Sequence, residues 1–312
     1  MDLQERFRGS LLGLAVGDAL GTTAEGWPRG TFVPLRGIAG GGPFGLTPGE
    51  WTDDTATAWC LAESLVVRNG FDAVDQMDRF VRWWREGYHS ATGRCVGIGC
   101  TMQGSLERYL QTGDPLAGPV GPQTAGNRCI ARLAPVALFY SGDREHSILY
   151  AGLSSRTTHG TRECIDACRL LGDVLYLVVS GAPKEQALLA HSRKLVKEAS
   201  VRAVARGDWR RKGAEGIRGD GRVVGSLEAA LWSFGTTRSF ADAVLRAANL
   251  GDDADTTAAV CGQVAGAYYG AGAIPGPWLR MLAKRGDLRR AADRLLAATL
   301  ATRRPTPERD AA

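Results

Sequence analysis

The sequence predicts an all-α fold made of one domain. Helical spacing of apolar residues recurs along most of the chain, and strand-like alternation is scarce. Turns that contain Gly and Pro, such as 119–126 and 273–277, separate the helical segments. No linker or low-complexity break divides the 312 residues, 44% of which are hydrophobic, so we expect a single domain over 1–302. The tail 303–312 is expected to be disordered.

Apolar residues that recur every three to four positions, together with start and stop signals, define the helices. The first helix contains the apolar run 11–16, and the second has Ala58, Leu61 and Leu65 on one face before a stop at 69–70. In chain order, the predicted helices span 4–21, 52–68, 72–86, 127–140, 161–180, 183–206, 226–235, 238–249, 255–270 and 286–301.

Two of these segments carry further information. Residues 255–270 have a stripe of small residues at helical spacing, including Ala258, Gly262 and Gly266, which would let another helix approach closely. The stretch 22–49, with eight glycines and four prolines, is predicted to be an irregular loop. Because a loop of this length is unusual without a role, we expect it to be functional and to cover a site.

Two short acidic clusters, TDDT at 52–55 and DDADT at 252–256, lie about 200 residues apart, each where a predicted helix begins. Either cluster alone is better explained by helix capping, because Asp and Thr are favoured N-caps and the helix dipole stabilises carboxylates in the first turn. Together they supply five carboxylates that would repel one another if they met without a cation. Oxygen ligands of this kind suit hard divalent cations, so the clusters predict a metal site formed by folding.

The order of several motifs resembles that of the ADP-ribosylglycohydrolases, the family of the dinitrogenase reductase-activating glycohydrolases. The main ones are RGSLLGLAVGDALG at 8–21, WTDDT at 51–55 and NLGDDADT at 249–256. Shorter matches lie between and around them, and the resemblance covers roughly residues 4 to 283. It implies a compact orthogonal helical bundle that hydrolyses the glycosidic bond between ADP-ribose and a modified acceptor, using two Mg²⁺ ions, with Mn²⁺ as the alternative metal.

The resemblance also implies roles for individual residues, motif by motif. The metal ligands would be Thr52, Asp53, Asp54, Asp253, Asp255 and Thr256. Glu25 would be catalytic, near the metals, and Asp54 would share that role. The ADP-ribose pocket would include Gly126, Asn127, Arg128, Cys129, His159 and Arg222. Without the resemblance, Glu25 is more simply a solvated loop carboxylate and His159 a structural residue.

Three positions depart from the family pattern. Arg128 stands where glycine normally follows Gly126-Asn127, Gly97 stands where many relatives have aspartate, and Arg222 stands where an aromatic residue often lines the pocket. Arg128 would either contact the diphosphate or block the approach of the loop to phosphate oxygens. A non-catalytic ADP-ribose-binding protein is therefore an alternative to an enzyme. The acceptor favoured by the resemblance is ADP-ribosylated arginine on protein, with serine, nucleic acid and small molecules as alternatives.

Charge and composition bear on whether the chain is a nucleic-acid-binding, membrane or secreted protein. The net charge is +5, and basic residues gather between 193 and 222, so nucleic-acid binding by a surface around Trp209 is a second, less favoured alternative. The proposed contact residues are Arg206, Arg210, Arg211, Lys212 and Arg218. No apolar run reaches the roughly 18–20 residues that span a bilayer, and the N-terminus lacks the order of a secretory signal, so we expect a cytoplasmic protein with no membrane partner.

The seven cysteines form no pattern typical of a zinc site or a disulfide framework. Cys164 and Cys168 lie one helical turn apart, which suits a buried stripe. We therefore expect reduced thiols and no Cys-His nucleophile, although Cys129 lies beside the 126–127 loop.

Overall fold

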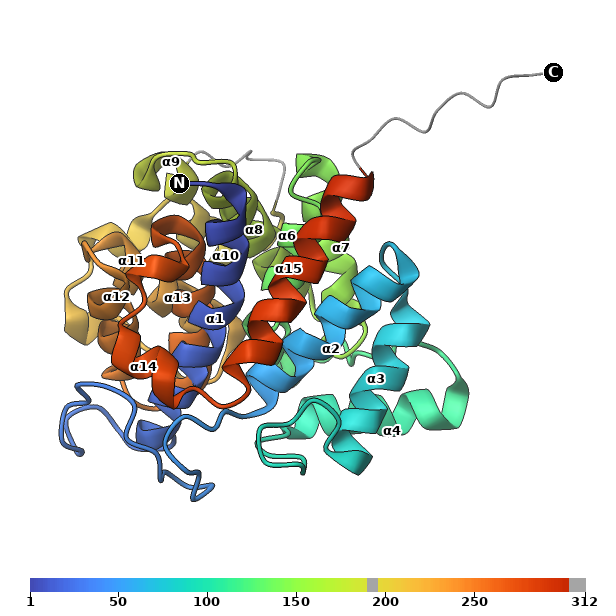
Figure 1. Ribbon diagram of the computed structural model, residues 1–312, viewed down its shortest axis with the longest axis horizontal. Coiled ribbons are helices and arrows are strands. Elements are labelled where there is room, and N and C mark those ends of the chain that lie inside the picture. Colours follow the sequence, from blue (N-terminus) through green and yellow to red (C-terminus); the bar gives the residue numbers. More distant parts are fainter. Residues whose placement is uncertain (190–195, 303–312) are drawn as a thin grey trace.

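A computed structural model describes residues 1–189 and 196–302, and within these ranges it contains helices and no β-strand, which confirms the all-α prediction (Figure 1). The α-helices are α1 (Leu3–Gly21), α2 (Asp53–Arg68), α3 (Ala73–Glu86), α4 (Cys100–Thr112), α5 (Arg128–Ala131), α6 (Ala134–Phe139), α7 (Arg144–Arg156), α8 (Arg162–Val179), α9 (Lys184–Leu189), α10 (Ala199–Ala205), α11 (Val223–Gly235), α12 (Phe240–Ala248), α13 (Ala254–Tyr269), α14 (Gly276–Met281) and α15 (Arg285–Thr302).

Helices α1 and α13 pack against each other in opposite directions with their backbones in contact. A Cβ atom added to Gly13 would lie 2.3 Å from the carbonyl oxygen of Gly262, and one added to Gly9 would lie 2.1 Å from that of Gly266. Small residues at this spacing allow the close approach that the sequence predicted. As a result, Gly21, at the end of α1, lies beside Ala254, at the start of α13.

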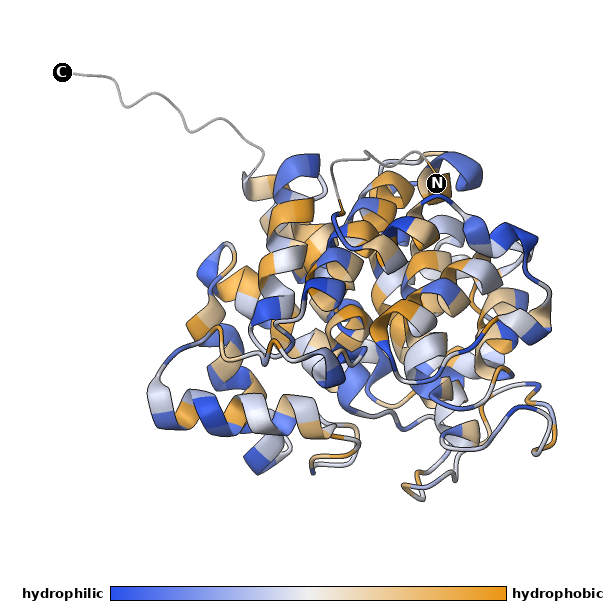
Figure 2. Ribbon diagram, turned by 180° about the vertical axis from the view of Figure 1, so that it is seen from behind, coloured by the Kyte–Doolittle hydropathy of each residue, from blue (hydrophilic) through white to orange (hydrophobic). Residues whose placement is uncertain are grey.

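The other helices enclose this pair. Helix α15 lies along α1 and α2, and α12 and α11 pack against α13 (Figure 1). In Figure 2 the hydrophobic residues lie mainly on the helices packed in the middle of the molecule. The largest fully buried side chains include Trp51, Trp83 and Phe240.

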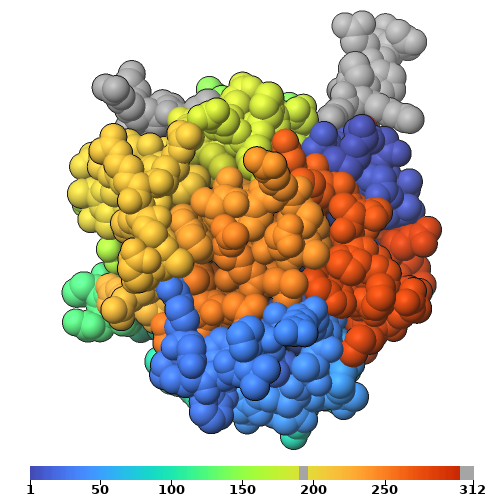
Figure 3. All heavy atoms as spheres, turned by 90° about the vertical axis from the view of Figure 1, so that its left-hand side faces the viewer, coloured from blue at the N-terminus to red at the C-terminus, as the bar shows by residue number. Residues whose placement is uncertain are grey.

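The segment that joins α1 to α2 is irregular, as predicted. It contains one short 3₁₀ turn, Thr22–Ala24, and a single bridge between Gly41 and Leu46. In Figure 3 this blue segment covers one end of the molecule and lies against the orange C-terminal helices. Its backbone pairs with the start of α13, because Gly26 N donates to Asp252 O and Asp252 N donates to Trp27 O, both at 2.8 Å.

Several helix predictions differ from the structure. The predicted helix 127–140 is two helices, α5 and α6, because Pro135 lacks an amide hydrogen and is accommodated in the first turn of a new helix. Helices α4, α7 and α14 were not predicted. The buried face of α7 consists of Ser147, Gly152 and other small residues, so its sequence lacks an apolar stripe.

The predicted helix 183–206 is also interrupted. Residues 196–198, between α9 and α10, are not helical, and α10 begins at Ala199. Residues 190–195 and the predicted disordered tail 303–312 lie outside the described residues. In the rest of the chain, no helix combines the length and the hydropathy needed to cross a membrane. All seven cysteines are free thiols, and both Cys164 and Cys168 are buried, as predicted.

Candidate functional site

Asp18 of α1 holds the first acidic cluster in place. Its carboxylate is completely buried and accepts hydrogen bonds from four donors, the backbone N–H and the hydroxyl group of both Thr52 and Thr55, at 2.7–3.1 Å. Thr52 makes no side-chain capping bond of its own, so a carboxylate from another helix caps α2. The side chains of Asp53 and Asp54 therefore do not have to cap the helix.

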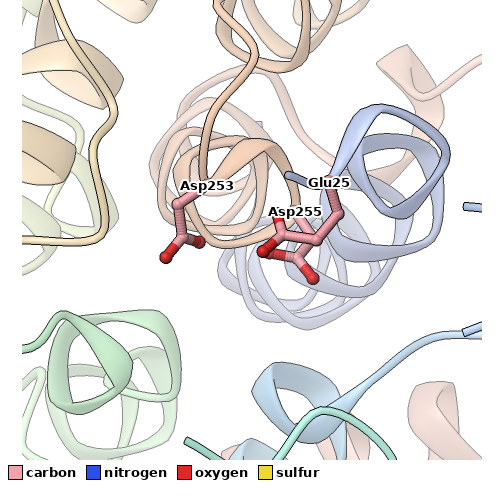
Figure 4. A group of neighbouring side chains, drawn as sticks. All are labelled: Glu25, Asp253 and Asp255. Atoms are coloured by element: carbon pink, nitrogen blue, oxygen red, sulfur yellow. The ribbon is translucent and has the colours of Figure 1, made fainter. Parts of the chain in front are cut away.

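Glu25 plays the same part at the second acidic cluster. Its Oε2 accepts a hydrogen bond of 2.9 Å from the backbone N–H of Ala254, the first residue of α13. Figure 4 shows the carboxylates of Glu25 and Asp255 next to each other, with Asp253 beside them. One oxygen from each of these three residues lies within 4.8 Å of the other two. Glu25 is thus a half-buried member of an acidic group and not a solvated loop residue.

The side chain of Arg128 lies between the two clusters and shows that they meet. Its Nε is 2.9 Å from Asp53 Oδ2 and 3.9 Å from Asp54 Oδ1, and its Nη1 is 3.2 Å from Asp253 Oδ1. The same Nη1 also contacts the hydroxyl of Thr256. Residues that are about 200 positions apart in the sequence therefore surround one guanidinium group.

Several carboxylate oxygens at this point have no hydrogen-bond donor. Both oxygens of Asp53, both of Asp54 and Oδ2 of Asp255 are buried without one among the described residues. Arg128 Nε lies close to Asp53 but is not aligned for a hydrogen bond. Buried carboxylates without donors are costly unless a cation compensates them. The donor set, made of carboxylates and threonine hydroxyls, fits a hard divalent cation.

The pKa values at the site reflect burial and the density of negative charge. Burial, with the neighbouring Asp253, raises the pKa of Glu25 to about 7, and burial likewise raises the pKa of Asp53 to about 7. Burial also raises the pKa values of Asp54 and Asp255 well above their usual range. Burial alone would also raise the pKa of Asp253, but Arg128 and nearby hydrogen bonds keep it below its usual value.

Glycines bring the backbone close to both clusters. Gly97 has φ +83°, and a Cβ atom there would lie 2.6 Å from Asp53 Oδ1. Gly221 has φ +78°, and its Cβ would lie 3.0 Å from Asp253 Oδ2. The departure at Gly97 therefore has a structural reason, because in this backbone conformation any side chain would be strained and would collide with Asp53.

A cleft of about 290 Å³ opens above the clusters. It is lined by 99–102, Gln123, 125–128, His159, 220–222 and Asp253. Five of the six predicted pocket residues line it: Gly126, Asn127, Arg128, His159 and Arg222. The two sides of the cleft are joined by a backbone bridge between Gly126 and Arg222 and by a hydrogen bond from Val223 N to Ala125 O.

The lining residues differ in what they can offer a ligand. Asn127 is buried, and its amide donates to Ser226 Oγ at 2.8 Å and to Asp253 Oδ2 at 3.3 Å, so it positions the acidic cluster. Arg222 is exposed at the rim, and its guanidinium lies 3.6 Å from Glu163. The sixth predicted pocket residue, Cys129, is buried with its Sγ near Gly126 O, behind the cleft lining.

His159 is buried with Nδ1 2.8 Å from Thr158 Oγ1. Its Nε2 faces the backbone of Gly126, where a Cβ atom would lie 3.4 Å away. Burial lowers the pKa of His159 to about 4, so the ring is neutral near pH 7. A neutral ring at the wall of the cleft suits packing and hydrogen bonding better than charge neutralisation.

The basic surface that motivated a nucleic-acid alternative is partly neutralised by ion pairs. Trp209 is buried with 3% exposure, which removes it as a stacking platform for bases. Arg206 pairs with Asp208 at 2.7 Å, and Lys212 pairs with Glu228 at 2.7 Å. These ion pairs reduce the positive field that phosphate binding needs.

The role of Asp18 was not predicted from the sequence. The residue lies inside the apolar stretch of α1, and a carboxylate in a helix that is buried along most of its length must have compensating donors. The position of Asp18 in an apolar stretch could have indicated a buried, hydrogen-bonded carboxylate. Its donors, Thr52 and Thr55, come close to it only in the folded chain.

Comparison with known proteins gives a consistent result. The family model for ADP-ribosylglycohydrolase matches residues 1–305. The chain is 41% identical to "ADP-ribosylarginine hydrolase Tri1" of Serratia proteamaculans over 93% of this chain and 79% of that protein. It is 31% identical to the ADP-ribosyl-[dinitrogen reductase] glycohydrolase of Rhodospirillum rubrum over 95% and 97% of the two chains. A solved structure titled "ADP-ribosylglycohydrolase-related protein complex" superimposes with a TM-score of 0.85 at 45% identity, covering 95% and 99% of the two chains.

Proposed function

Because this chain belongs to the ADP-ribosylglycohydrolase family and is a hydrolase of ADP-ribosyl bonds, we propose that it releases ADP-ribose from ADP-ribosylated arginine on protein in a reaction that depends on Mg²⁺. The observation that supports the metal dependence most directly is the meeting of the two acidic clusters around one point, where several buried carboxylate oxygens have no donor among the described residues.

Six side chains would hold two Mg²⁺ ions, with Mn²⁺ as the alternative. They are Thr52, Asp53, Asp54, Asp253, Asp255 and Thr256. When bound, the ions supply Lewis-acid stabilisation and lower the pKa of a coordinated water molecule. Asp18 acts on the first three ligands indirectly, because its hydrogen bonds fix the start of α2.

Glu25 is the favoured proton acceptor. Its carboxylate lies within 4.8 Å of those of Asp253 and Asp255, beside the proposed metal ligands, where it could take a proton from a coordinated water molecule. Asp54, which is more deeply buried, would contribute through the metal site and share the catalytic role. Cleavage at the anomeric carbon passes through a transition state with oxocarbenium character, which nearby carboxylates stabilise.

The ADP-ribose moiety would occupy the cleft above the clusters. Gly126 offers backbone close to a phosphate, His159 offers a neutral ring, and Arg222 offers a cation at the rim. Asp253 lines the cleft and is a proposed metal ligand, so a distal ribose bound there would lie near the metal site. Arginine is the favoured acceptor because a relative that is 41% identical is named an ADP-ribosylarginine hydrolase.

The test is turnover of defined substrates. We expect release of free ADP-ribose from a peptide carrying ADP-ribosylarginine in the presence of Mg²⁺, and loss of this release with a chelator, measured by chromatography. A peptide carrying ADP-ribosylserine tests the acceptor, because faster turnover of the serine substrate would contradict the arginine assignment. Tight ADP-ribose binding without turnover of either substrate would contradict the enzymatic proposal.

A matched pair of variants tests the ligand assignment. Asp253→Asn should abolish turnover, whereas Asp252→Asn, which removes the same charge one residue earlier, should retain it. Asparagine tolerates the left-handed conformation of Asp252, whose φ is +55°, so this control should fold normally. Near-normal turnover of Asp253→Asn at limiting Mg²⁺ would show that the residue is not a ligand.

A further inference from the structure

The positively charged group of Arg128 occupies the place where the proposed metal ligands converge. It contacts Asp53, Asp253 and Thr256, which belong to both clusters. Its side chain is only 14% exposed. The sequence resemblance implies glycine at this position, so Arg128 supplies a cation that the family pattern does not predict.

We propose that Arg128 is an internal competitor of the divalent cations, which holds the two acidic clusters together until metal binding displaces its guanidinium into the ADP-ribose cleft. The inference rests on the proposed function, because it takes the ligand set from it. It concerns the control of that site and not the reaction itself.

Arg128 and a metal ion would compete because both would use the same carboxylate oxygens of Asp53 and Asp253. Mg²⁺ binds oxygen at about 2.0–2.1 Å in a nearly octahedral arrangement. The Arg128 nitrogens lie 2.9 Å from Asp53 Oδ2 and 3.2 Å from Asp253 Oδ1. An ion bound to these two oxygens would bring its charge into the space of the guanidinium, and two cations at such a distance repel strongly in a buried site. Arg128 must therefore move when the proposed ligands bind an ion.

The displaced side chain has a suitable destination. Arg128 is the first residue of α5, and it lines the cleft together with Gly126 and His159. A diphosphate in this cleft offers a guanidinium strong, charge-assisted hydrogen bonds in place of the carboxylates it leaves. The diphosphate contact suggested by the sequence would be the displaced position of the side chain, whereas its place among the carboxylates was not predicted.

The competition can be measured by titrating the protein with Mg²⁺ in the absence of substrate, using calorimetry. If Arg128 occupies the clusters in most molecules, only the small fraction with the guanidinium displaced can bind metal, and the apparent Mg²⁺ affinity falls in proportion to that fraction. Arg128→Gln should therefore bind Mg²⁺ at least about tenfold more tightly than the wild type. Arg222→Gln is the matched control, because it removes the same charge from the same cleft without touching a cluster carboxylate. An unchanged affinity in Arg128→Gln, or an equal gain in Arg222→Gln, would overturn the inference.

A second measurement uses the native side chain, in case the variant fails to fold. The Nε–H group of a buried, ion-paired arginine exchanges slowly with water. In protein labelled with ¹⁵N-arginine, the Arg128 signal, assigned with Arg128→Lys, should lose this protection when Mg²⁺ is added. Protection that persists at saturating Mg²⁺ would show that the guanidinium stays in place.

These outcomes can be separated from those of the proposed function. Wild-type protein that hydrolyses ADP-ribosylarginine but binds Mg²⁺ no more weakly than Arg128→Gln would refute the competition and leave the proposed function intact. If Arg128→Gln binds Mg²⁺ more tightly than the wild type but the wild type hydrolyses no ADP-ribosylated substrate, the competition is supported and the proposed function is refuted.

Discussion

Asp18 illustrates how a single buried charge can organise a site that it does not enter. Its carboxylate receives four hydrogen bonds from Thr52 and Thr55, and these fix the first turn of α2. Burial raises its pKa, and the threonine hydrogen bonds oppose that rise. Because the helix end is satisfied from outside, Asp53 and Asp54 are free to serve as ligands.

Asp18→Asn should therefore weaken both the fold and the site. The amide NH₂ group of asparagine would face the N–H and hydroxyl donors of Thr52 and Thr55, and the charge-assisted hydrogen bonds would be lost. We therefore expect the free energy of unfolding, measured with urea, to fall by about 1–3 kcal/mol, and Mg²⁺ binding, measured by calorimetry, to weaken. Asp72→Ala is the control, because Asp72 caps α3 in the ordinary local way, and its loss should lower stability by about 1 kcal/mol without affecting metal binding. Normal Mg²⁺ affinity in Asp18→Asn would refute the positioning role.

His159 gives a prediction about pH. Burial lowers its pKa to about 4, whereas an unfolded histidine titrates near 6.5. Between these values the unfolded chain takes up a proton that the folded chain does not, so the contribution of the neutral ring to stability is complete above pH 6.5 and is lost as the pH falls towards 4. The free energy of unfolding that is lost in this way is at most about 3 kcal/mol.

Urea unfolding at several pH values tests this contribution. The difference in stability between the wild type and His159→Gln should shrink or reverse as the pH is lowered from 7 to 4, because glutamine does not titrate. A difference that is constant over this range would show that the pKa of His159 is not depressed.

At the scale of secondary structure, the contact between α1 and α13 decides the position of the acidic residues. The two backbones touch at Gly13 and Gly262, and the same alignment places the end of α1 beside the start of α13. Asp18 lies in α1 and Glu25 lies shortly after its end, whereas Asp253 is at the N-cap position of α13 and Asp255 lies in its first turn. A change in the helix separation would be passed directly to the site.

Gly13→Ala should be strongly destabilising. Its Cβ would lie 2.3 Å from Gly262 O and 3.0 Å from the Phe240 ring, and a backbone neighbour cannot rotate away. Overpacking of this kind typically costs about 1–3 kcal/mol or more. Gly104→Ala, in α4, meets open space and should instead stabilise the protein by roughly 0.5–1 kcal/mol. Thermal unfolding distinguishes the two, and similar shifts in both variants would contradict the close-contact explanation.

For the molecule as a whole, metal binding and folding should be coupled. The proposed ligands come from helix starts about 200 residues apart and meet only in the folded chain. A cation that binds only the folded state stabilises it by about 2.7 kcal/mol when present at 100 times its dissociation constant. We therefore expect the midpoint of thermal unfolding to rise with Mg²⁺ concentration.

Single and double variants should show that both clusters are needed. Asp53→Ala and Asp253→Ala should each remove the Mg²⁺-dependent rise, and the double variant should remove no more than either one, because half a site does not bind. An Mg²⁺-dependent rise that survives in one single variant would mean that the clusters bind cations separately. Circular dichroism would confirm that the helices are retained.

Much of the fold could be predicted because it depends on local patterns. The helices α1, α2, α8, α12 and α13 follow from apolar spacing, caps and stops that lie within each segment. Helix α7 was missed because its buried face is made of small residues, which have no apolar periodicity to detect. The division of 127–140 was missed although Pro135 was visible, since the effect of a proline depends on where the first turn begins.

The family, the all-α class and the chemical types of the candidate site follow from the sequence alone. These types are two groups of carboxylates and threonines, a glutamate in a long loop and a glycine-containing cleft loop. Four features required the folded structure: Asp18 caps α2, Glu25 caps α13, Cys129 lies behind the cleft, and Arg128 points into the acidic clusters. Residue type and helix periodicity are local properties of the chain. Which donor meets which buried carboxylate depends on contacts between residues far apart in sequence, and those are fixed by the packing of α1 against α13.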